Sequence, residues 1–286
     1  MHFETWQALA GENPPIDRIS MVAFDTETTG MGSPDRLLEI AGVRFRGRQI
    51  AGEFSRLVDP GRPVSPETTA IHGITTKMVR GQWSAREALQ EFFAFAEGSV
   101  LIAHNACFDA GIVAGEYFRS GILPPENPIL DSLKLARRTL SCSSYSLEAL
   151  VRDLPLPRED HHRALPDSRH VFRLFRRICT ELANDGNPFL SEILARNGKV
   201  ITLGGSMPEI PDLPENFQPL REASDQATPV VILYEPREGS TGYRTVTPKL
   251  FYRRKEVIYM EAFCHASGYD RCYRLDRIRE CRSGGD

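Results

Sequence analysis

The segment VAFDTETTG, residues 22–30, constrains this chain more than any other stretch. A short apolar run leads into Asp25 and Glu27, and residues two apart in a β-strand project from the same face. Two neighbouring carboxylates repel each other, and burying them without a partner is costly. A divalent cation relieves that repulsion, and paired hard oxygen ligands suit Mg²⁺ or Mn²⁺ better than zinc. The alternative for an isolated DxE sequence is a strand end whose acids are solvated or cap a turn.

Two further acidic motifs follow in the chain. HNACFD, residues 104–109, comes directly after the apolar run 100–103, where a strand would pass into a helix. In HHRALPDSRHVFRLFRRI, His162 lies five residues before Asp167 at the beginning of an amphipathic helix. Three acidic motifs in this order and in these contexts carry much more weight than any one of them.

With these motifs, residues 18–183 resemble the DEDDh branch of the DnaQ-like 3′–5′ exonucleases. FDTETTG is similar to the first exonuclease motif of that family and HNACFD to the second. His162, Ala164 and Asp167 match the third, which reads H-x-A-x-x-D. The resemblance implies hydrolysis of phosphodiester bonds with two divalent cations, Mg²⁺ or Mn²⁺.

The resemblance also implies a role for each acid. Asp25 would bridge the two cations, Glu27 and Asp167 would hold the cation on the water side, and Asp109 would hold the second, mostly through water. Four carboxylates neutralise two divalent cations, so the number of acids fits. Losing one of them should remove most activity.

His162 is implied as the general base, because its unperturbed pKa near 6.5 allows a neutral imidazole that accepts a proton from the attacking water. His161 is a rival for this role, and the A-x-x-D spacing favours His162. We expect His104 to be a strand-end residue and His170 a helix-surface residue.

Around this centre, the resemblance points to a pocket for the terminal nucleotide. Contacts there read a strand end and its backbone, so little base preference is expected. The candidate residues are Thr28, Gly30, Asn105 and Phe108. The segment AIHGITTKMV, residues 70–79, resembles one that lies close to the substrate cleft in this family, which makes His72 a further candidate; the alternative is a structural loop histidine.

The order of the predicted elements fits a three-layer α/β fold with a mixed sheet, of the RNase H-like kind, over residues 18–197. A leading hairpin around the first motif supplies the antiparallel part. Strands are predicted at 18–25, 37–46, 49–58, 100–103 and 129–131, and helices at 84–98, from about 105, at 132–140, 147–154 and 163–182.

The remainder of the chain has a different pattern. Residues 198–227 contain several prolines among acids and are predicted to be a partly extended linker. Residues 228–282 alternate as strands do, separated by turns, and predict a small antiparallel sheet or barrel.

Three segments of this C-terminal part resemble a WYL domain, namely 244–248, 258–260 and 274–278. Ile258 and Met260 stand where that family has Trp and Leu, so the chain departs from the triplet that names the domain. The resemblance implies a groove that binds nucleic acid or a small regulatory ligand, with candidates Arg244, Tyr259, Arg274 and Arg277. The alternative is that these are solvated strand residues or salt-bridge partners.

Composition sets the remaining limits. No apolar run approaches the ~20 residues that span a bilayer, and the N-terminus lacks a basic region followed by an apolar core, so we expect a cytoplasmic protein with reduced thiols at its six cysteines. The net charge is −3, but residues 228–286 hold 11 Lys and Arg against 8 Asp and Glu, a net of +3 that is compatible with contact to nucleic acid.

The leading hypothesis from the sequence is a metal-dependent 3′–5′ exonuclease acting on single-stranded or frayed DNA ends, with a C-terminal module that engages nucleic acid or a regulator. Proofreading, DNA repair and fragment degradation all use this reaction. A 3′–5′ exoribonuclease is an alternative, since the same acids and histidine serve both sugars. A nucleic-acid-binding or ligand-sensing protein centred on the WYL-like part is another, against which the complete set of acids and His162 counts.

Overall fold

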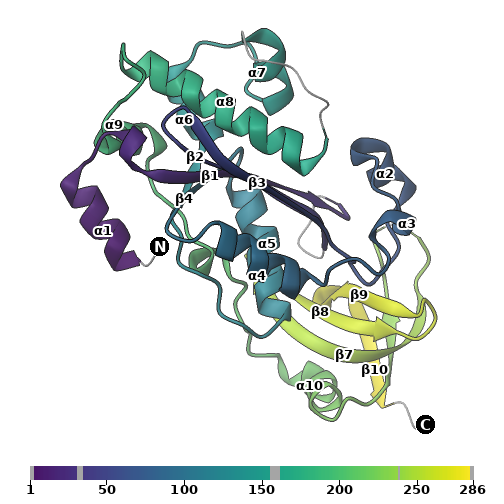
Figure 1. Ribbon diagram of the computed structural model, residues 1–286. Helices are drawn as coiled ribbons and strands as arrows, with labels where there is room; N and C mark the ends of the chain where they lie inside the picture. Colours follow the sequence, from purple (N-terminus) through teal and green to yellow (C-terminus); the bar gives the residue numbers. More distant parts are fainter. Residues whose placement is uncertain (1–2, 31–34, 155–161, 238, 284–286) are drawn as a thin grey trace. The chain divides into compact units, whose positions relative to one another are not determined.

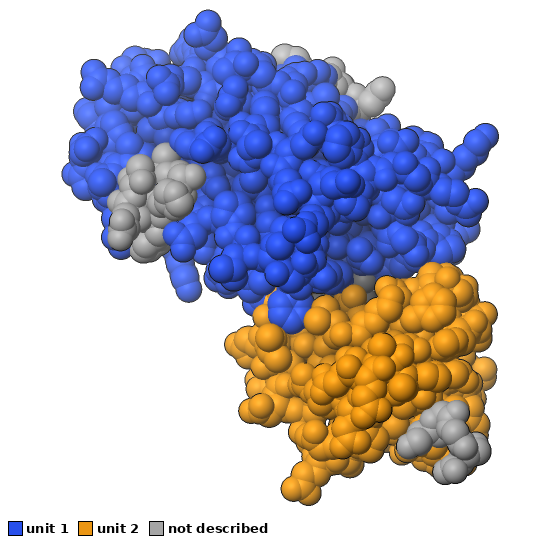
Figure 2. Space-filling model, turned by 60° about the horizontal axis from the view of Figure 1, so that its bottom comes forward, with its two compact units in different colours: residues 1–31, 35–207 blue, residues 32–34, 208–286 orange. Residues whose placement is uncertain are grey.

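The computed structural model describes residues 3–30, 35–154, 162–237 and 239–283 (Figure 1). They form two compact units, one ending at Met207 and the other beginning at Pro208 (Figure 2). None of the six cysteines is in a disulfide. No helix in the described ranges is long and apolar enough to cross a membrane.

The first unit is built on a five-stranded sheet in the order β3-β2-β1-β4-β5. The hairpin strands β2 and β3 are antiparallel to their neighbours, whereas β4 is parallel to β1 and to β5. The predicted mixed sheet with a leading antiparallel hairpin is therefore confirmed. The strands are β1 Ser20–Thr28, β2 Leu37–Arg46, β3 Gln49–Leu57, β4 Val100–Ala103 and β5 Ile129–Asp131.

Helices surround this sheet. Those of the first unit are α1 Phe3–Glu12, α2 Pro66–His72, α3 Thr76–Val79, α4 Ala85–Phe95, α5 Cys107–Arg119, α6 Ser132–Thr139, α7 Leu147–Asp153, α8 Ala164–Leu182 and α9 Leu190–Asn197, with 3₁₀ turns η1 Ile16–Arg18 and η2 Gly204–Ser206. Local sequence explains where α4 begins. Ser84 and Glu87 form a reciprocal capping box there, which satisfies amide groups that a helix start leaves unpaired.

Alternation along β1 divides the core into two layers. Met21 and Ala23 pack in one apolar cluster with residues of α8, and Val22 and Phe24 pack in another with residues of α4 and α5. Helices consequently cover both faces of the sheet (Figure 1), as a three-layer fold requires. Odd-numbered residues of β1 face α8.

The first strand is longer than the sequence predicts. It was expected to end at Asp25, and it continues to Thr28 because β2 keeps pairing with it. Asp25 lies opposite Ala41 and Glu27 opposite Glu39 in this register. The acidic pair therefore lies inside a regular strand, where its geometry is fixed by hydrogen bonding on the β2 side.

The second unit contains a five-stranded antiparallel sheet in the order β10-β6-β7-β8-β9. Its strands are β6 Val230–Tyr234, β7 Gly242–Arg254, β8 Val257–Cys264, β9 Tyr269–Arg274 and β10 Ile278–Ser283. The prediction of a single strand over CYRLDRI is wrong, because the 3₁₀ turn η4 Leu275–Arg277 divides this segment between β9 and β10. Among the described strands β9 and β10 are the two ends of the order and the turn η4 joins them, so the predicted small antiparallel β domain is confirmed.

The predicted linker, residues 198–227, contains regular structure. The 3₁₀ turn η3 Glu215–Phe217 leads into the helix α10 Gln218–Asp225, which the sequence analysis did not predict. Leu220 and Ala223 of α10 pack into the core of the second unit. Pro219 lies in the first turn of this helix, where a missing amide proton does no harm. Because proline is tolerated in the first turn of a helix, the prolines of this segment do not exclude a helix there.

Replacing Gly42 of β2 with alanine tests how tightly the sheet packs against α4. A Cβ there would lie 2.9 Å from Val22 Cγ1 and 3.0 Å from Phe92 Cε2, so Gly42→Ala should lower the free energy of unfolding by about 1–3 kcal/mol. Both tryptophans lie in the first unit, so urea denaturation followed by their fluorescence reports its unfolding. Gly52→Ala on β3 is the control, because its new Cβ would meet its nearest atom, in Phe95, at 3.5 Å. Equal effects of the two changes would contradict this packing.

Candidate metal centre

Three carboxylates from two distant segments meet at one face of the first sheet. One oxygen from each of Asp25, Glu27 and Asp167 lies within 4.8 Å of the others. The first two come from β1 and the third from the N-terminal part of α8, and all three side chains are partly accessible. The structure thus brings together the first and third motifs of the sequence.

The packing of α8 on the strand pair explains this meeting. Ser168 is fully buried, and its hydroxyl lies 2.7 Å from the carbonyl oxygen of Ala164 and 3.2 Å from that of Ala41. Ala41 is the residue of β2 that pairs with Asp25. The start of the helix therefore rests on the strand pair beside the acids, and Asp167 follows within one turn.

Asp109 reaches the centre from the opposite layer. It is buried in the first turn of α5, and its Oδ1 accepts hydrogen bonds from the backbone N–H of Thr26 at 3.1 Å and from the Thr26 hydroxyl at 2.7 Å. Thr26 lies between Asp25 and Glu27 and points to the other face. Its two hydrogen bonds fix Asp109 next to the acidic pair, although Asp109 is outside the group of three mutually close carboxylates.

Electrostatics make the site unfavourable for bare carboxylates. Burial and then the charges of Asp109, Glu27, Asp167 and Glu39 hold the pKa of Asp25 well above its ordinary value. Burial and neighbouring carboxylates raise the pKa of Glu27 to about 8, although Arg163 opposes this. Burial raises the pKa of Asp109 to about 7 against the hydrogen bonds from Thr26. The protein supplies too little positive charge to hold these groups ionised.

The donor set fits a hard divalent cation. It consists of carboxylate oxygens only, without a thiolate or imidazole in the group, which matches the preference of Mg²⁺ or Mn²⁺ and not that of zinc. A bound cation would offset both the burial and the mutual repulsion that disfavour the ionised carboxylates. The three carboxylates therefore form a set of ligands suited to a bound divalent cation.

His162 lies immediately before α8. Its backbone is in the left-handed region, with φ of 63°, and its N–H donates to Oδ2 of Asp167 at 3.0 Å. Its side chain is exposed. The described contact thus links His162 to the acid cluster through the main chain. The rival residue, His161, lies outside the described residues.

The prediction that His170 is a helix-surface residue is wrong. Its side chain is fully buried, and its Nδ1 lies 3.3 Å from Oδ1 of Asp167, one turn earlier on α8. This contact restrains the orientation of the Asp167 carboxylate. His104 follows β4 as expected, with its ring between the Ser132 hydroxyl at 3.0 Å and the carbonyl oxygen of Tyr145 at 2.9 Å.

The candidate substrate residues have different environments. Thr28 is buried, and its hydroxyl donates to the carbonyl oxygen of Gly30. A Cβ at Gly30 would lie 2.7 Å from Oδ1 of Asp35, so a side chain there would displace that carboxylate. Asn105 is exposed and has a left-handed backbone, and its N–H donates to Asp131. Phe108, in the first turn of α5, is half-buried against the core cluster that contains Val22 and Phe24.

His72 ends α2 and is buried, with 5% of its surface exposed. Its Nδ1 accepts the N–H of Ile74 at 3.0 Å, so the proton of a neutral ring is on Nε2. Burial is the main cause of the lowered pKa of this imidazole. The ring holds the turn after α2, and its pKa also responds to a hydrogen bond with the Thr28 backbone and to the charge of Glu39, so the role of His72 near the substrate stays a prediction.

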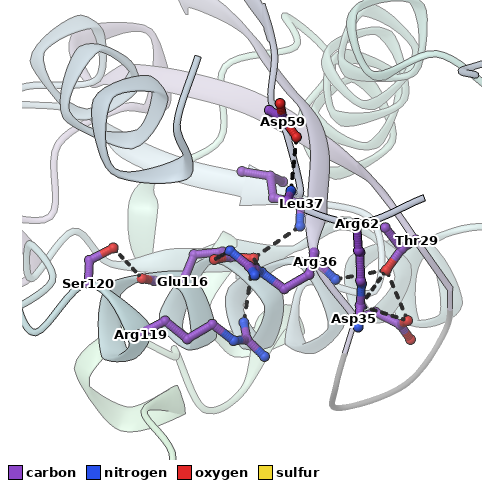
Figure 3. A network of polar contacts seen from close by, with 10 residues as sticks. Thr29, Asp35, Arg36, Leu37, Asp59, Arg62, Glu116, Arg119 and Ser120 are labelled. Atoms are coloured by element: carbon purple, nitrogen blue, oxygen red, sulfur yellow. Dashed lines mark hydrogen bonds and ion pairs between the residues drawn. The ribbon is translucent and has the colours of Figure 1, made fainter. Parts of the chain in front are cut away.

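A polar network that the sequence analysis missed holds the ends of β1 and β2 beside α5 (Figure 3). The buried carboxylate of Glu116 accepts from Nε and Nη2 of Arg36 at 2.7 and 3.1 Å and from the N–H of Leu37 at 3.2 Å. Thr29 Oγ1 accepts from the N–H of Arg36 at 3.0 Å and from Arg62 Nη2 at 2.7 Å. These residues are scattered in sequence, and only the hairpin register identifies them as a group.

The second unit separates the residues proposed for its groove. Tyr259 and Arg274 are cross-strand partners on β8 and β9, and the Tyr259 ring stacks on Tyr252 with centroids 5.5 Å apart and 15° between the planes. Arg244 pairs instead with Ile232, a residue of the core, so it lies on the opposite face of the sheet. Arg277 lies in the η4 turn, where its carbonyl oxygen accepts the N–H of Glu235.

Comparison with known proteins identifies two families. A family model described as exonuclease matches residues 22–175, and one described as the WYL domain matches residues 215–283, a range that includes α10. The structure of exonuclease I described as suggesting how processivity is achieved has a TM-score of 0.52 and 15% identity, covering 86% of this chain and 55% of that one, and shows a shared fold. The predicted RNase H-like fold and the WYL domain are confirmed.

Curated relatives match about three fifths of this chain. The PolC-type DNA polymerase III of Thermotoga maritima is 37% identical over 175 residues, which is 61% of this chain and 13% of the relative. The DNA polymerase III subunit epsilon-like protein of Rhodobacter capsulatus is 39% identical over 179 residues, which is 60% of this chain and 25% of the relative. The matched region thus spans a quarter or less of each relative.

The raised pKa values predict a strongly pH-dependent metal affinity. A carboxylate must lose its proton to bind a cation, and the pKa of Glu27 is about 8. We expect Mn²⁺ affinity to rise steadily from about pH 6 to about pH 9, with proton release that isothermal titration calorimetry detects in buffers of different ionisation enthalpy. Glu27→Gln should weaken binding and flatten this dependence. An affinity that is constant over this range would contradict the description of the site.

The metal-free protein should show the linked effect on stability. The folded-state pKa of Glu27 is raised from 4.5 to about 8, so its stabilising contribution is present below the lower value and is lost as pH rises through the upper one. Thermal melting in EDTA should therefore show a falling melting temperature over this window. Glu27→Gln should reduce the fall, and Mg²⁺ should reverse it at the alkaline end.

Proposed function

The chain belongs to the exonuclease family, and on that premise we propose that it is a DEDDh-type 3′–5′ exonuclease that removes nucleotides from DNA ends. One observation carries the proposal. Carboxylate oxygens of Asp25, Glu27 and Asp167 meet within 4.8 Å, and Thr26 holds Asp109 beside them. A centre for divalent cations accounts for the raised pKa values of Asp25, Glu27 and Asp109 in one place.

The acids are proposed to hold two divalent cations, Mg²⁺ or Mn²⁺. Asp25 would be shared between them, with Glu27 and Asp167 on one cation and Asp109 at the second. Such a pair of ions, when bound, promotes attack by water and stabilises the departing 3′ oxygen. The influence of the other three proposed ligands, Glu27, Asp109 and Asp167, on the pKa of Asp25 fits a carboxylate shared between the cations.

His162 is proposed as the general base that accepts a proton from the attacking water. The N–H of His162 on Asp167 ties the main chain at this position to the acid cluster. An exposed ring on a left-handed backbone has room to approach a bound strand end. Removing a general base costs about 10²–10⁴ in rate, so the effect of His162→Ala should be large but not complete.

The names of the relatives support DNA as the substrate. Both matched relatives are described as DNA polymerase III proteins, and the acids and histidine proposed here act on the phosphodiester and not on the base. The first unit would therefore accept an end of almost any sequence.

The second unit is proposed to bind the same nucleic acid through Tyr259 and Arg274. Tyr259 stacks on the buried Tyr252, which holds its ring in place, and aromatic rings stack on bases with little sequence preference. Arg274 is its cross-strand partner and supplies positive charge, although Asp276 binds its guanidinium. Tyr259 and Arg274 thus place an aromatic ring and a guanidinium at neighbouring positions of the sheet.

The reaction is tested by a time course on 5′-labelled single-stranded DNA and RNA of one sequence with Mg²⁺ or Mn²⁺. We expect DNA to shorten from its 3′ end as a ladder, Asp25→Ala to abolish shortening, and His162→Ala to slow it by about 10²–10⁴. Glu91→Gln, which breaks an ion pair on α4 between partly exposed side chains, serves as the control and should behave as wild type.

Three results would overturn or change this proposal. Absence of metal-dependent shortening of either strand would exclude an exonuclease. Preferential shortening of RNA would keep the mechanism and replace the substrate. Full activity of Asp25→Ala would show that the carboxylate cluster is not the reaction centre.

Binding by the second unit is tested in the full chain with Asp25→Asn as an inactive background. Tyr259→Ala should weaken binding of a single-stranded oligonucleotide about tenfold, as expected from losing one stacked base, measured by fluorescence anisotropy. Arg274→Ala should reduce the salt dependence by about one counterion. Tyr243→Ala is the control, because this exposed tyrosine on β7 instead contacts Arg282. Equal effects of the two tyrosine changes would contradict the proposed surface.

A further inference from the structure

Glu39 is a buried carboxylate beside the candidate metal centre that does not belong to it. It lies on β2 directly opposite Glu27, with 2% of its surface exposed. Cross-strand partners project from the same face, so its side chain leaves the sheet on the α8 side, as that of Glu27 does. Yet Glu39 is absent from the group of three converging acids.

Both oxygens of Glu39 are occupied by protein donors. Arg163 donates from Nη2 to Oε1 at 2.8 Å and from Nε to Oε2 at 2.9 Å. The N–H of Ala164 donates to Oε2 at 3.1 Å, and the Ser55 hydroxyl donates to Oε1 at 3.1 Å. A carboxylate with four such donors, two of them in the planar fork of one guanidinium, is fully satisfied without a cation.

These contacts fix the beginning of α8. Arg163 is the N-cap of the helix and makes no side-chain capping hydrogen bond of its own, and Ala164 is the first helical residue. A helix start leaves amide groups unpaired and favours negative charge nearby. Glu39 of β2 accepts the N–H of Ala164 and brings negative charge to the helix start. It therefore caps the helix in place of an N-cap side chain.

The helix start carries the groups proposed for catalysis. His162 directly precedes Arg163, and its N–H donates to Asp167, which lies one turn into the helix. A shift of this turn would therefore move the third-motif acid and the proposed base together. Small displacements of such groups are costly for catalysis, because reacting atoms must be aligned closely.

We propose that Glu39 and Arg163 are positioning residues that hold Asp167 and His162 against the acids of β1. The pair touches neither substrate nor cation in this role and acts through the first turn of α8. This inference rests on the proposed function, since it concerns the geometry of that reaction.

The first test compares Arg163→Ala with Arg169→Ala. Arg169 is a matched control: it lies on the same helix and makes a similar forked ion pair, with Glu53 of β3, at 2.8 and 2.6 Å. Single-turnover removal of the 3′ nucleotide should slow about 10–100-fold in Arg163→Ala, with the oligonucleotide concentration for half-maximal rate changed less than about threefold. Arg169→Ala should stay within about twofold of wild type.

A readout independent of nuclease activity is Mn²⁺ binding followed by electron paramagnetic resonance. Arg163→Ala should weaken Mn²⁺ binding by about 10–100-fold, because Asp167 is displaced, whereas Arg169→Ala should not. Arg163→Lys keeps the charge but loses the fork and should fall between wild type and Arg163→Ala in both measurements. Thermal melting shows whether each variant is folded before it is compared.

The second test is the double variant of Glu39→Gln with Arg163→Ala. Two residues that act through one contact have effects that do not add, so the double variant should be no slower than the slower single variant. Additive effects would show that the residues act separately and would overturn the proposal.

Two other results would also overturn it. A raised half-maximal oligonucleotide concentration with an unchanged maximal rate would make Arg163 a substrate contact. Unchanged rate and unchanged Mn²⁺ binding would make the pair a purely structural ion pair. Failure of the proposed function is a separate result, because wild type would then show no metal-dependent shortening.

Discussion

Like charges on the odd-numbered face of β1 are the constraint on which the arrangement of the first unit depends. Asp25 and Glu27 project side by side toward α8, and the hairpin register places Glu39 next to them. Asp167 and Asp109 come from helices on opposite faces of the sheet. Burial, and then the repulsion between carboxylates this close, raise the pKa values of Asp25 and Glu27, and these shifts express the cost of ionising the site.

The protein resolves this repulsion in two ways. It neutralises Glu39 with Arg163 and the start of α8, and it restrains Asp109 with two hydrogen bonds from Thr26. Oxygens of the three remaining acids, Asp25, Glu27 and Asp167, lie within 4.8 Å of one another, and this is the side of the site where we propose that a cation binds. A cation bound there would make part of the folding free energy conditional on metal, since ion binding and deprotonation are linked.

The sequence predicted much of this because the signals were local. The alternation of β1 and the motifs near Asp109 and Asp167 name the carboxylates directly, and the hairpin bounds 37–46 are those of β2. Contacts that depend on register were missed. Glu39 and Arg163 are separated by 124 residues, and their pairing follows only when β2 lies against β1 and α8 rests on both.

Burial and face were likewise hard to predict from the sequence. His170 sits at a helix position that suits either surface or core, and only the packing of α8 makes it a buried partner of Asp167. Arg244 lies on a regular strand, and the pairing with Ile232 places it on the core side. In α10, prolines near the helix start hid an apolar pattern that the second unit buries.

The most direct measurement is the anomalous diffraction of crystals that contain Mn²⁺ and a single-stranded oligonucleotide with a non-hydrolysable 3′ linkage. The account predicts two peaks about 3.5–4 Å apart, with oxygens of Asp25, Glu27 and Asp167 on the first and Asp109 near the second. Glu39 should remain on Arg163 and away from both ions. Absence of Mn²⁺ from the acid cluster, or Mn²⁺ ligated by Glu39, would contradict it.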